Sequence, residues 1–135
     1  MSTTFTTLEI DTTIMRELYL DIFKDLTVTE LKALKKIIAK NFLKDELYRV
    51  YKIDRTDSSQ LTALDELIDT YSTTFQTALM YLQCYYYFVE NDDVDGRNAQ
   101  RKSDCWRNYN ALKADFPTFS TENLVTTGMA TVSRG

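Results

Sequence analysis

Histidine is absent from this chain of 135 residues. Its absence removes the commonest general base, the usual partner of a serine or cysteine nucleophile, and the commonest zinc ligand. The three glycines, Gly96, Gly128 and Gly135, lie too far apart to form a phosphate-binding loop. Catalysis by carboxylates alone or by a metal held by carboxylates is left, but no pattern of residues specifies either. We therefore predict that the protein is not an enzyme and that it needs no metal or cofactor.

Proline, cysteine and long apolar runs are also scarce. One proline and three glycines suit long helices with few tight turns, and no apolar run is long enough for a transmembrane helix. Residues 1–5 lack the basic and apolar regions of a signal peptide. We therefore expect no membrane association, a reducing compartment and free thiols at Cys84 and Cys105. A disulfide is the alternative, because these cysteines are almost equally far from the turn at 90–96.

The most regular pattern is a series of apolar residues that recur at alternating steps of three and four. Such spacing is typical of a helix that packs against other helices. It predicts one long helix, about 43 Å long if unbroken at 1.5 Å per residue. Ser72 and the two threonines after it are its weakest part, because their hydroxyls compete for backbone hydrogen bonds. The series is Leu61, Leu64, Ile68, Tyr71, Phe75, Ala78, Leu82, Tyr85 and Val89.

Three further helices are predicted around this one. A helix over residues 11–26 carries the stripe Ile14, Leu18 and Ile22. A second follows the capping-box sequence at 27–30 and carries Leu31, Leu34, Ile38 and Phe42. The last runs from about residue 98 to residue 116 and is ended by Pro117. Because the turn at 90–96 is short, the last two predicted helices should form an antiparallel hairpin over about 58–116.

These patterns predict an all-α fold, a small bundle of four or five helices. The helical domain should occupy residues 11–117. Residues 1–10 are rich in threonine and are expected to form an extended N-terminal arm. Residues 118–135 carry no helical stripe, and their threonines and valines favour extended structure, so we expect a C-terminal arm there.

The acidic turn has part of the pattern of a calcium-binding EF-hand. Asn91, Asp93, Asp95 and Gly96 occupy the first, third, fifth and sixth positions of such a loop. The twelfth position, however, is Lys102, where a bidentate glutamate is needed. An ammonium group there repels calcium. We therefore interpret this stretch as a solvated turn between two helices and predict no metal site.

Aromatic residues are abundant, with nine tyrosines, seven phenylalanines and one tryptophan. Tyr81, Tyr85, Tyr86, Tyr87 and Phe88 span every direction around a helix axis, so they cannot all face one core. Tyrosine is typical of protein interfaces. We expect at least one of these tyrosines to contact a partner subunit. A platform for stacking nucleic-acid bases is the alternative, which the net charge of −4 disfavours.

Two groups of basic residues allow further hypotheses. The lysines from Lys32 to Lys40 most simply form a solvated helix face, and binding of phosphates is the alternative. Arg97 and Arg101 lie early in the last predicted helix, where positive charge opposes the helix dipole. We therefore expect these arginines to pair with carboxylates of a partner.

The aromatic helix at 78–88, the acidic turn and the charged segment at 101–109 together resemble a known family. They are similar to the paired helices of head–tail connector proteins of tailed bacteriophages, the adaptor and neck proteins. The resemblance covers residues 61–116. It implies a structural protein of the virion, located at the head–tail junction after assembly in the host cytoplasm. It also implies rings of this chain, often twelve-fold, between the portal protein and tail or neck proteins, with DNA passing through and not bound specifically.

In that family a C-terminal arm commonly reaches onto the portal or a neighbouring subunit. The resemblance therefore implies docking by the arm of this chain, and its candidate contact residues are Leu124, Val125, Met129, Val132 and Arg134. Two alternatives to a head–tail adaptor stay open. One is a small cytoplasmic regulator that binds another protein through its tyrosines. The other is a helical nucleic-acid-binding protein that uses the face from Lys32 to Lys40.

Overall fold

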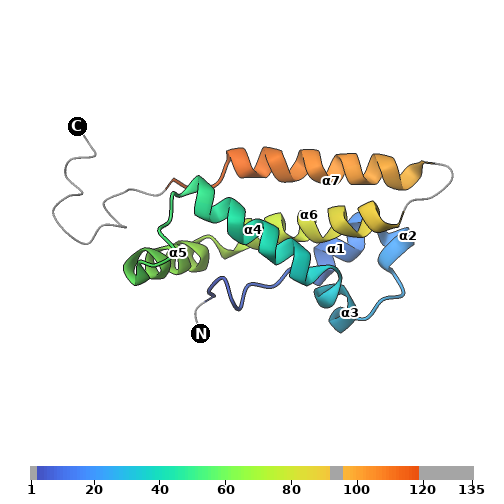
Figure 1. The fold of residues 1–135 in the computed structure, drawn as a ribbon. Helices are drawn as coiled ribbons and strands as arrows, with labels where there is room; N and C mark the ends of the chain where they lie inside the picture. Colours follow the sequence, from blue (N-terminus) through green and yellow to red (C-terminus); the bar gives the residue numbers. More distant parts are fainter. Residues whose placement is uncertain (1–2, 92–95, 119–135) are drawn as a thin grey trace. The chain divides into compact units, whose positions relative to one another are not determined.

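The computed structural model describes residues 3–91 and 96–118 of the chain. Those residues form seven helices and no strand (Figure 1), so the all-α prediction is confirmed. None of these helices is long and apolar enough to cross a bilayer. The helices are α1 (Thr12–Leu18), α2 (Leu20–Phe23), α3 (Val28–Ala33), α4 (Lys36–Val50), α5 (Ser58–Thr70), α6 (Ser72–Glu90) and α7 (Arg97–Ala114).

The chain forms two compact units. The first takes the described residues of Met1–Leu8, Lys44–Ser72 and Pro117–Gly135, and therefore contains α5. The second takes those of Glu9–Leu43 and Thr73–Phe116, and therefore contains α1, α2, α3 and α7 with nearly all of α6. The stretch expected to form an N-terminal arm has neither helix nor strand from residue 3 to residue 10, and its Leu8 and Ile10 are buried. The expected C-terminal arm lies outside the described residues from 119 onward.

The helix expected over residues 11–26 is interrupted at Tyr19, whose backbone leaves the helical region at φ −134° and ψ 62°. Asp11 caps α1 as its sequence suggests, with Oδ1 accepting from the backbone N–H groups of Thr13 and Ile14. The buried stripe is not the one predicted. Ile14 and Leu18 are exposed, and Met15 and Phe23 are buried in their place.

The aromatic rings decide which face of α1 and α2 turns inward. Tyr19 packs edge-on against Phe88 with ring centroids 5.0 Å apart, and Phe23 packs against Tyr87 at 5.4 Å. Burial of the aromatic rings removes more apolar surface from water than burial of Ile14 and Leu18 would, and the edge-on ring pairs stabilise the fold further. The side of α1 and α2 that carries Met15, Tyr19 and Phe23 therefore faces α6.

The second predicted helix is also interrupted. The capping box is present as predicted: Thr27 Oγ1 accepts from the Glu30 N–H, and the Glu30 carboxylate accepts from the Thr27 N–H. The helix then stops at Leu34, and Lys35 adopts the left-handed region at φ 54°. The chain becomes helical again in α4, but its side chains no longer continue the faces of α3. Ile38 is therefore exposed.

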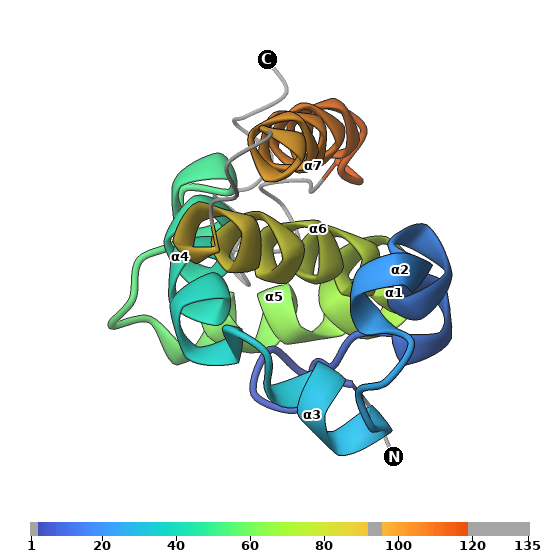
Figure 2. The same ribbon diagram turned by 90° about the vertical axis from the view of Figure 1, so that its right-hand side faces the viewer.

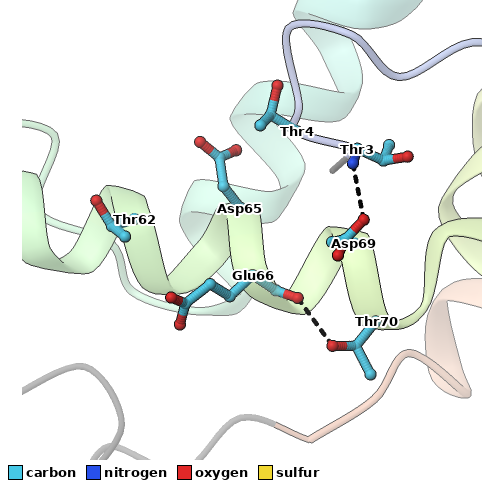
Figure 3. A pocket seen from close by; sticks show the side chains of 7 residues that line it. All are labelled: Thr3, Thr4, Thr62, Asp65, Glu66, Asp69 and Thr70. Carbon is cyan, nitrogen blue, oxygen red and sulfur yellow. Dashed lines mark hydrogen bonds between the residues drawn. The ribbon is translucent and has the colours of Figure 1, made fainter. Parts of the chain in front are cut away.

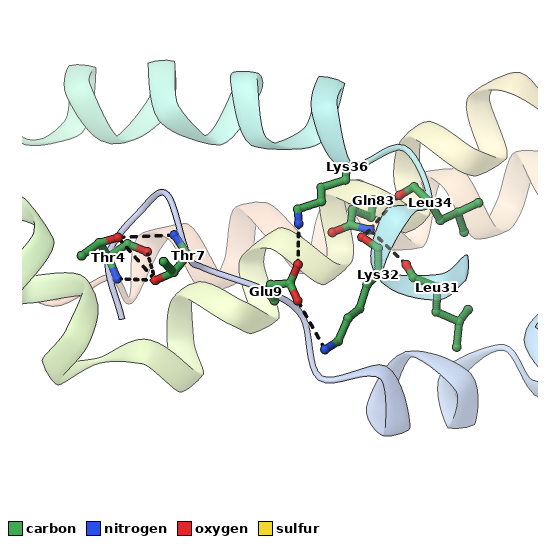
Figure 4. Close-up of polar contacts among 8 residues, drawn as sticks. All are labelled: Thr4, Thr7, Glu9, Leu31, Lys32, Leu34, Lys36 and Gln83. Carbon is green, nitrogen blue, oxygen red and sulfur yellow. Dashed lines mark hydrogen bonds and ion pairs between the residues drawn. The ribbon is translucent and has the colours of Figure 1, made fainter. Parts of the chain in front are cut away.

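A buried glutamine on α6 supports this interruption. Gln83 Nε2 donates to the carbonyl oxygen of Leu34 at 2.7 Å and to that of Leu31 at 3.3 Å (Figure 4). The last carbonyls of a helix have no partner within the helix. Gln83 therefore satisfies the end of α3 from a neighbouring helix, and it does so where the chain turns into α4.

The long helix predicted from Leu61 to Val89 is in fact two helices, α5 and α6. They are separated at Tyr71, where φ is −116° and ψ is 39°. The interruption falls one residue before the Ser-Thr-Thr stretch that we expected to be weakest. Nearby, the Thr70 hydroxyl donates to the carbonyl of Glu66 at 3.0 Å, a contact that competes with the helix ladder. The antiparallel hairpin is consequently made by α6 and α7 (Figure 1).

Helix α6 is the centre of the second unit and is buried on several sides, with Ala78, Leu79 and Met80 all inside. Near its end, four consecutive aromatic residues pack against different neighbours. Side chains turn by about 100° per residue along a helix, so each of the four points in its own direction. The pairs are Tyr85 with Trp106, Tyr86 with Phe42, Tyr87 with Phe23, and Phe88 with Tyr19.

Candidate protein-binding interface

Five aromatic rings from three helices gather on one side of the second unit, and we name this cluster the Trp106 platform. Its members are Phe42 from α4, Tyr85 and Tyr86 from α6, and Trp106 and Tyr109 from α7. Trp106 is central: its ring centroid lies 4.9 Å from Tyr85, 5.7 Å from Phe42 and 5.7 Å from Tyr109. Phe42 and Tyr109 close the cluster at 6.0 Å.

Some rings of the platform are buried inside the unit, and others are exposed to solvent. Tyr109 is completely buried, Phe42, Tyr85 and Tyr86 are half-buried, and Trp106 is 37% exposed. Rings held on several sides lose little conformational freedom when a partner covers them. Tryptophan is enriched among the residues that contribute most to binding at protein interfaces, so a partly exposed tryptophan fixed in this way is a candidate for such a contact.

The helix that carries the central tryptophan of the platform is basic. Helix α7, which carries Trp106, has five basic residues and one acidic residue. Arg107, directly after the tryptophan, has its side chain two-thirds exposed and pairs with Asp104 one turn earlier. A partner that covers Trp106 should therefore bring acidic groups to the edge of the contact.

The structure divides the predicted contact tyrosines. Tyr85 and Tyr86 belong to the platform. Tyr87 packs on Phe23 on another side of α6, and Tyr81 is half-buried one turn before Tyr85. The other platform members, Phe42, Trp106 and Tyr109, were not among our candidates. Phe42 lies in the apolar stripe predicted after the capping box, and it joins the platform because α4 restarts in a new register after Lys35.

The predicted arginines have different surroundings. Arg101 donates to Asp21 at 2.6 Å and to the Asn98 side chain at 3.0 Å, and its guanidinium lies 5.9 Å from the centre of the Phe88 ring. It thus holds α7 to α2 within the unit. Arg97 is exposed at the start of α7. The arm residues Leu124, Val125, Met129, Val132 and Arg134 lie outside the described residues, as do Asp93 and Asp95 of the acidic turn.

Comparison of this chain with known proteins found no match. No family model matches it. No curated protein matches it, and no solved structure does either. The platform must therefore be interpreted from its own geometry and charge.

The two cysteines lie in the core of the hairpin, Cys84 on α6 and Cys105 on α7. Both are free thiols, as predicted. Tyr19 Oη lies within hydrogen-bonding distance of Cys105 Sγ, at 3.2 Å. Hydrogen bonding with Cys105, together with burial, raises the pKa of the Cys84 thiol. A protonated, buried thiol is a poor nucleophile, so Cys84 serves packing, while its hydrogen bond lowers the pKa of Cys105.

A cavity of about 410 Å³ in the first unit gathers carboxylates (Figure 3). Two of them have structural partners: Asp69 accepts the Thr3 backbone N–H at 2.7 Å, and Asp65 accepts that of Phe5 at 3.0 Å. They fasten the start of the chain to α5. Among residues 3–91 and 96–118, no group of three or more cysteine or acidic side chains is placed to hold a metal.

The lysine face is engaged with carboxylates. Glu9 pairs with Lys32 at 3.3 Å and with Lys36 (Figure 4). Lys35 pairs with Glu90. The hydrogen bond from Lys36 is the largest cause that lowers the pKa of Glu9. Each such pair reduces the positive potential that a phosphate backbone would meet.

Proposed function

We propose that this protein is a structural adaptor that acts by binding other proteins, and that the Trp106 platform is its main contact surface. The observation that carries the proposal is the half-open tryptophan at the centre of four supporting rings. Packing alone would favour covering this ring with the chain's own residues. A tryptophan ring that neighbouring rings hold in place on one side, and that is exposed on the other, is suited to bind a partner's apolar side chains.

We further propose that the adaptor is a head–tail connector of a tailed bacteriophage. It would form a ring of copies that joins the portal protein to tail or neck proteins at the head–tail junction of the virion. Support comes from the resemblance of residues 61–116 to that family and from the stiff α6–α7 hairpin, whose sides can meet neighbours around a ring. The pairing of Lys32, Lys35 and Lys36 with carboxylates favours this proposal over nucleic-acid binding.

The test is binding of the full chain to portal rings, followed by sedimentation and by negative-stain electron microscopy. We expect a stoichiometric extra layer on the ring, and we expect Trp106→Ala and Arg107→Glu to weaken its binding. Arg107→Glu changes an exposed side chain, so its loss of binding cannot result from a failure to fold. Val50→Ala, at an exposed site in the first unit, is the matched control.

Two results would contradict the proposal. A chain that ignores the portal ring, while duplex DNA shifts it in a salt-sensitive manner, would favour the nucleic-acid alternative. Binding to the ring that neither platform variant alters would remove the platform from the proposal.

A further inference from the structure

A second unpartnered apolar surface lies on α1, and we name it the α1 ridge. It consists of Ile14, Glu17 and Leu18, which share one helix face at spacings of three and four. Ile14 is 42% exposed and Leu18 is 41% exposed. The ridge exists because the stripe with Met15 and Tyr19 turned inward, leaving two large aliphatic side chains at the surface.

The ridge and the Trp106 platform carry opposite charge. The segment from Asp11 to Asp25, which contains the ridge, has four acidic and two basic residues. Helix α7 has five basic residues and one acidic residue. Glu17 at the centre of the ridge and Arg107 at the edge of the platform are both exposed. An apolar ridge with an acidic centre therefore matches an aromatic platform with a basic edge.

The Phe42 and Tyr86 part of the platform lies on the side of α6 opposite to α1, whereas Tyr85, which contacts Trp106, points only about 60° away from Phe88. Tyr86 points to Phe42 of the platform, while Phe88 points to Tyr19 at the end of α1. Side chains two residues apart on a helix point in directions about 200° apart around its axis. Figure 2 shows the same arrangement, with α1 and α2 on one side of α6 and α4 on the other. Ile14 and Leu18 are exposed and Trp106 is left uncovered in this fold, so the ridge of one copy can meet a platform on a second copy.

We propose that the α1 ridge of one copy docks on the Trp106 platform of a second copy. The inference rests on the proposed adaptor function and names the contact by which the copies join. Ile14 and Leu18 cover the Trp106 ring, and Glu17 meets Arg107. Such a contact is heterologous, since different surfaces of the two copies meet, and each copy keeps one ridge or platform free. Repetition of the contact builds a closed ring or an open filament.

Sedimentation velocity of the full chain over a range of concentrations tests the docking. Leu18→Asp places a charge against the tryptophan, and we expect it to weaken self-association by about tenfold or more. Trp106→Ala should do the same from the other side of the contact. Val50→Asp is the matched control, because Val50 is 40% exposed and lies on neither surface. It should associate like the unchanged chain.

Mixing the variants separates a heterologous contact from a symmetric one. The chain with Leu18→Asp keeps its platform, and the chain with Trp106→Ala keeps its ridge. At concentrations where the unchanged chain has just assembled, each variant alone should be mainly monomeric, and an equal mixture should give a dimer and nothing larger, because only one pair of intact surfaces is available. Glu17→Lys and Arg107→Glu should each weaken association, and one chain carrying both substitutions should recover it.

Several outcomes overturn the docking. These are unchanged association of the Leu18→Asp chain, a mixture that stays monomeric, or an unchanged chain that is monomeric at every concentration. The portal-binding experiment distinguishes the two levels of the proposal. If the chain binds portal rings and the Leu18→Asp chain builds the same complete layer, the docking fails while the adaptor function stands. If neither portal binding nor self-association occurs, both fail.

Discussion

Replacing Gln83 with methionine tests how the interruption between α3 and α4 is held. Gln83 is 1% exposed, and its amide nitrogen faces the carbonyl oxygens of Leu34, Leu31 and Lys32 at 2.7, 3.3 and 3.4 Å. An amide group has two hydrogens, so it makes two full bonds at a time. Methionine fills a similar volume without donating, and it leaves those carbonyls without a partner.

Two opposing contributions determine how much the free energy of unfolding should fall in the Gln83→Met chain. Leaving buried acceptors unsatisfied costs about 1–3 kcal/mol. Gln83 Oε1 is itself buried without a partner in the described structure, so removing it returns part of that cost. We expect Gln83→Met to lower the free energy of unfolding by about 2 kcal/mol. Gln83→Glu should cost about 3–5 kcal/mol, because it aims an uncompensated carboxylate at the carbonyl oxygens.

Urea denaturation followed by circular dichroism measures both losses. Gln76→Met, on the same helix at a half-buried position, is the matched control and should stay within about 0.5 kcal/mol of the unchanged chain. Burial raises the pKa of the carboxyl introduced by Gln83→Glu in the folded state, so the deficit of that variant should shrink as the pH falls towards about 4. A Gln83→Met chain as stable as the control would refute the reasoning, since the end of α3 would then need no support from α6.

Three further perturbations have defined outcomes. Lys52 adopts the left-handed conformation at φ 53° after α4, where glycine is favoured, so Lys52→Gly should raise the free energy of unfolding by about 1 kcal/mol while Lys52→Ala should not. Burial raises the pKa of Tyr51 to about 12, and its hydroxyl donates to the Pro117 carbonyl at 2.8 Å. The folded state therefore keeps this proton when the unfolded state has lost it, and stability should fall between pH 10 and 12 in the unchanged chain but less in the Tyr51→Phe chain. Cys84 is buried with a raised pKa, so a thiol reagent should label it only as fast as the protein unfolds, and rapid labelling in the native state would contradict its packing role.

Local signals predicted the fold class and several helix ends. The capping box at Thr27 is present where the sequence predicted it, and the side chains of Asp11 and Asp57 cap α1 and α5. The apolar steps through Phe75, Ala78 and Leu82 correspond to a buried face of α6. Capping and periodicity depend on residues close in sequence, which is why they could be recognised in the sequence alone.

The interruptions depend on distant residues. Nothing near Lys35 requires a left-handed residue there; the amide of Gln83, almost fifty positions later, makes that turn favourable. Likewise, the stripe of Ile14 and Leu18 is as helical as the stripe of Met15 and Tyr19. Only the rings at the end of α6 decide between them. The platform could not be predicted for the same reason, because its Phe42 depends on the register that follows Lys35.

Four consecutive aromatic residues lie at the end of α6. They restrict the number of residues in that helix more than they restrict which aromatic residue stands at each position. Exchanging one ring for another at Tyr86 alters only its contacts with Phe42 and Tyr85. Deleting one residue upstream rotates the whole quartet by about 100° and presents every ring to the wrong helix at once. We expect natural variation in this segment to exchange aromatic types freely and to exclude insertions and deletions.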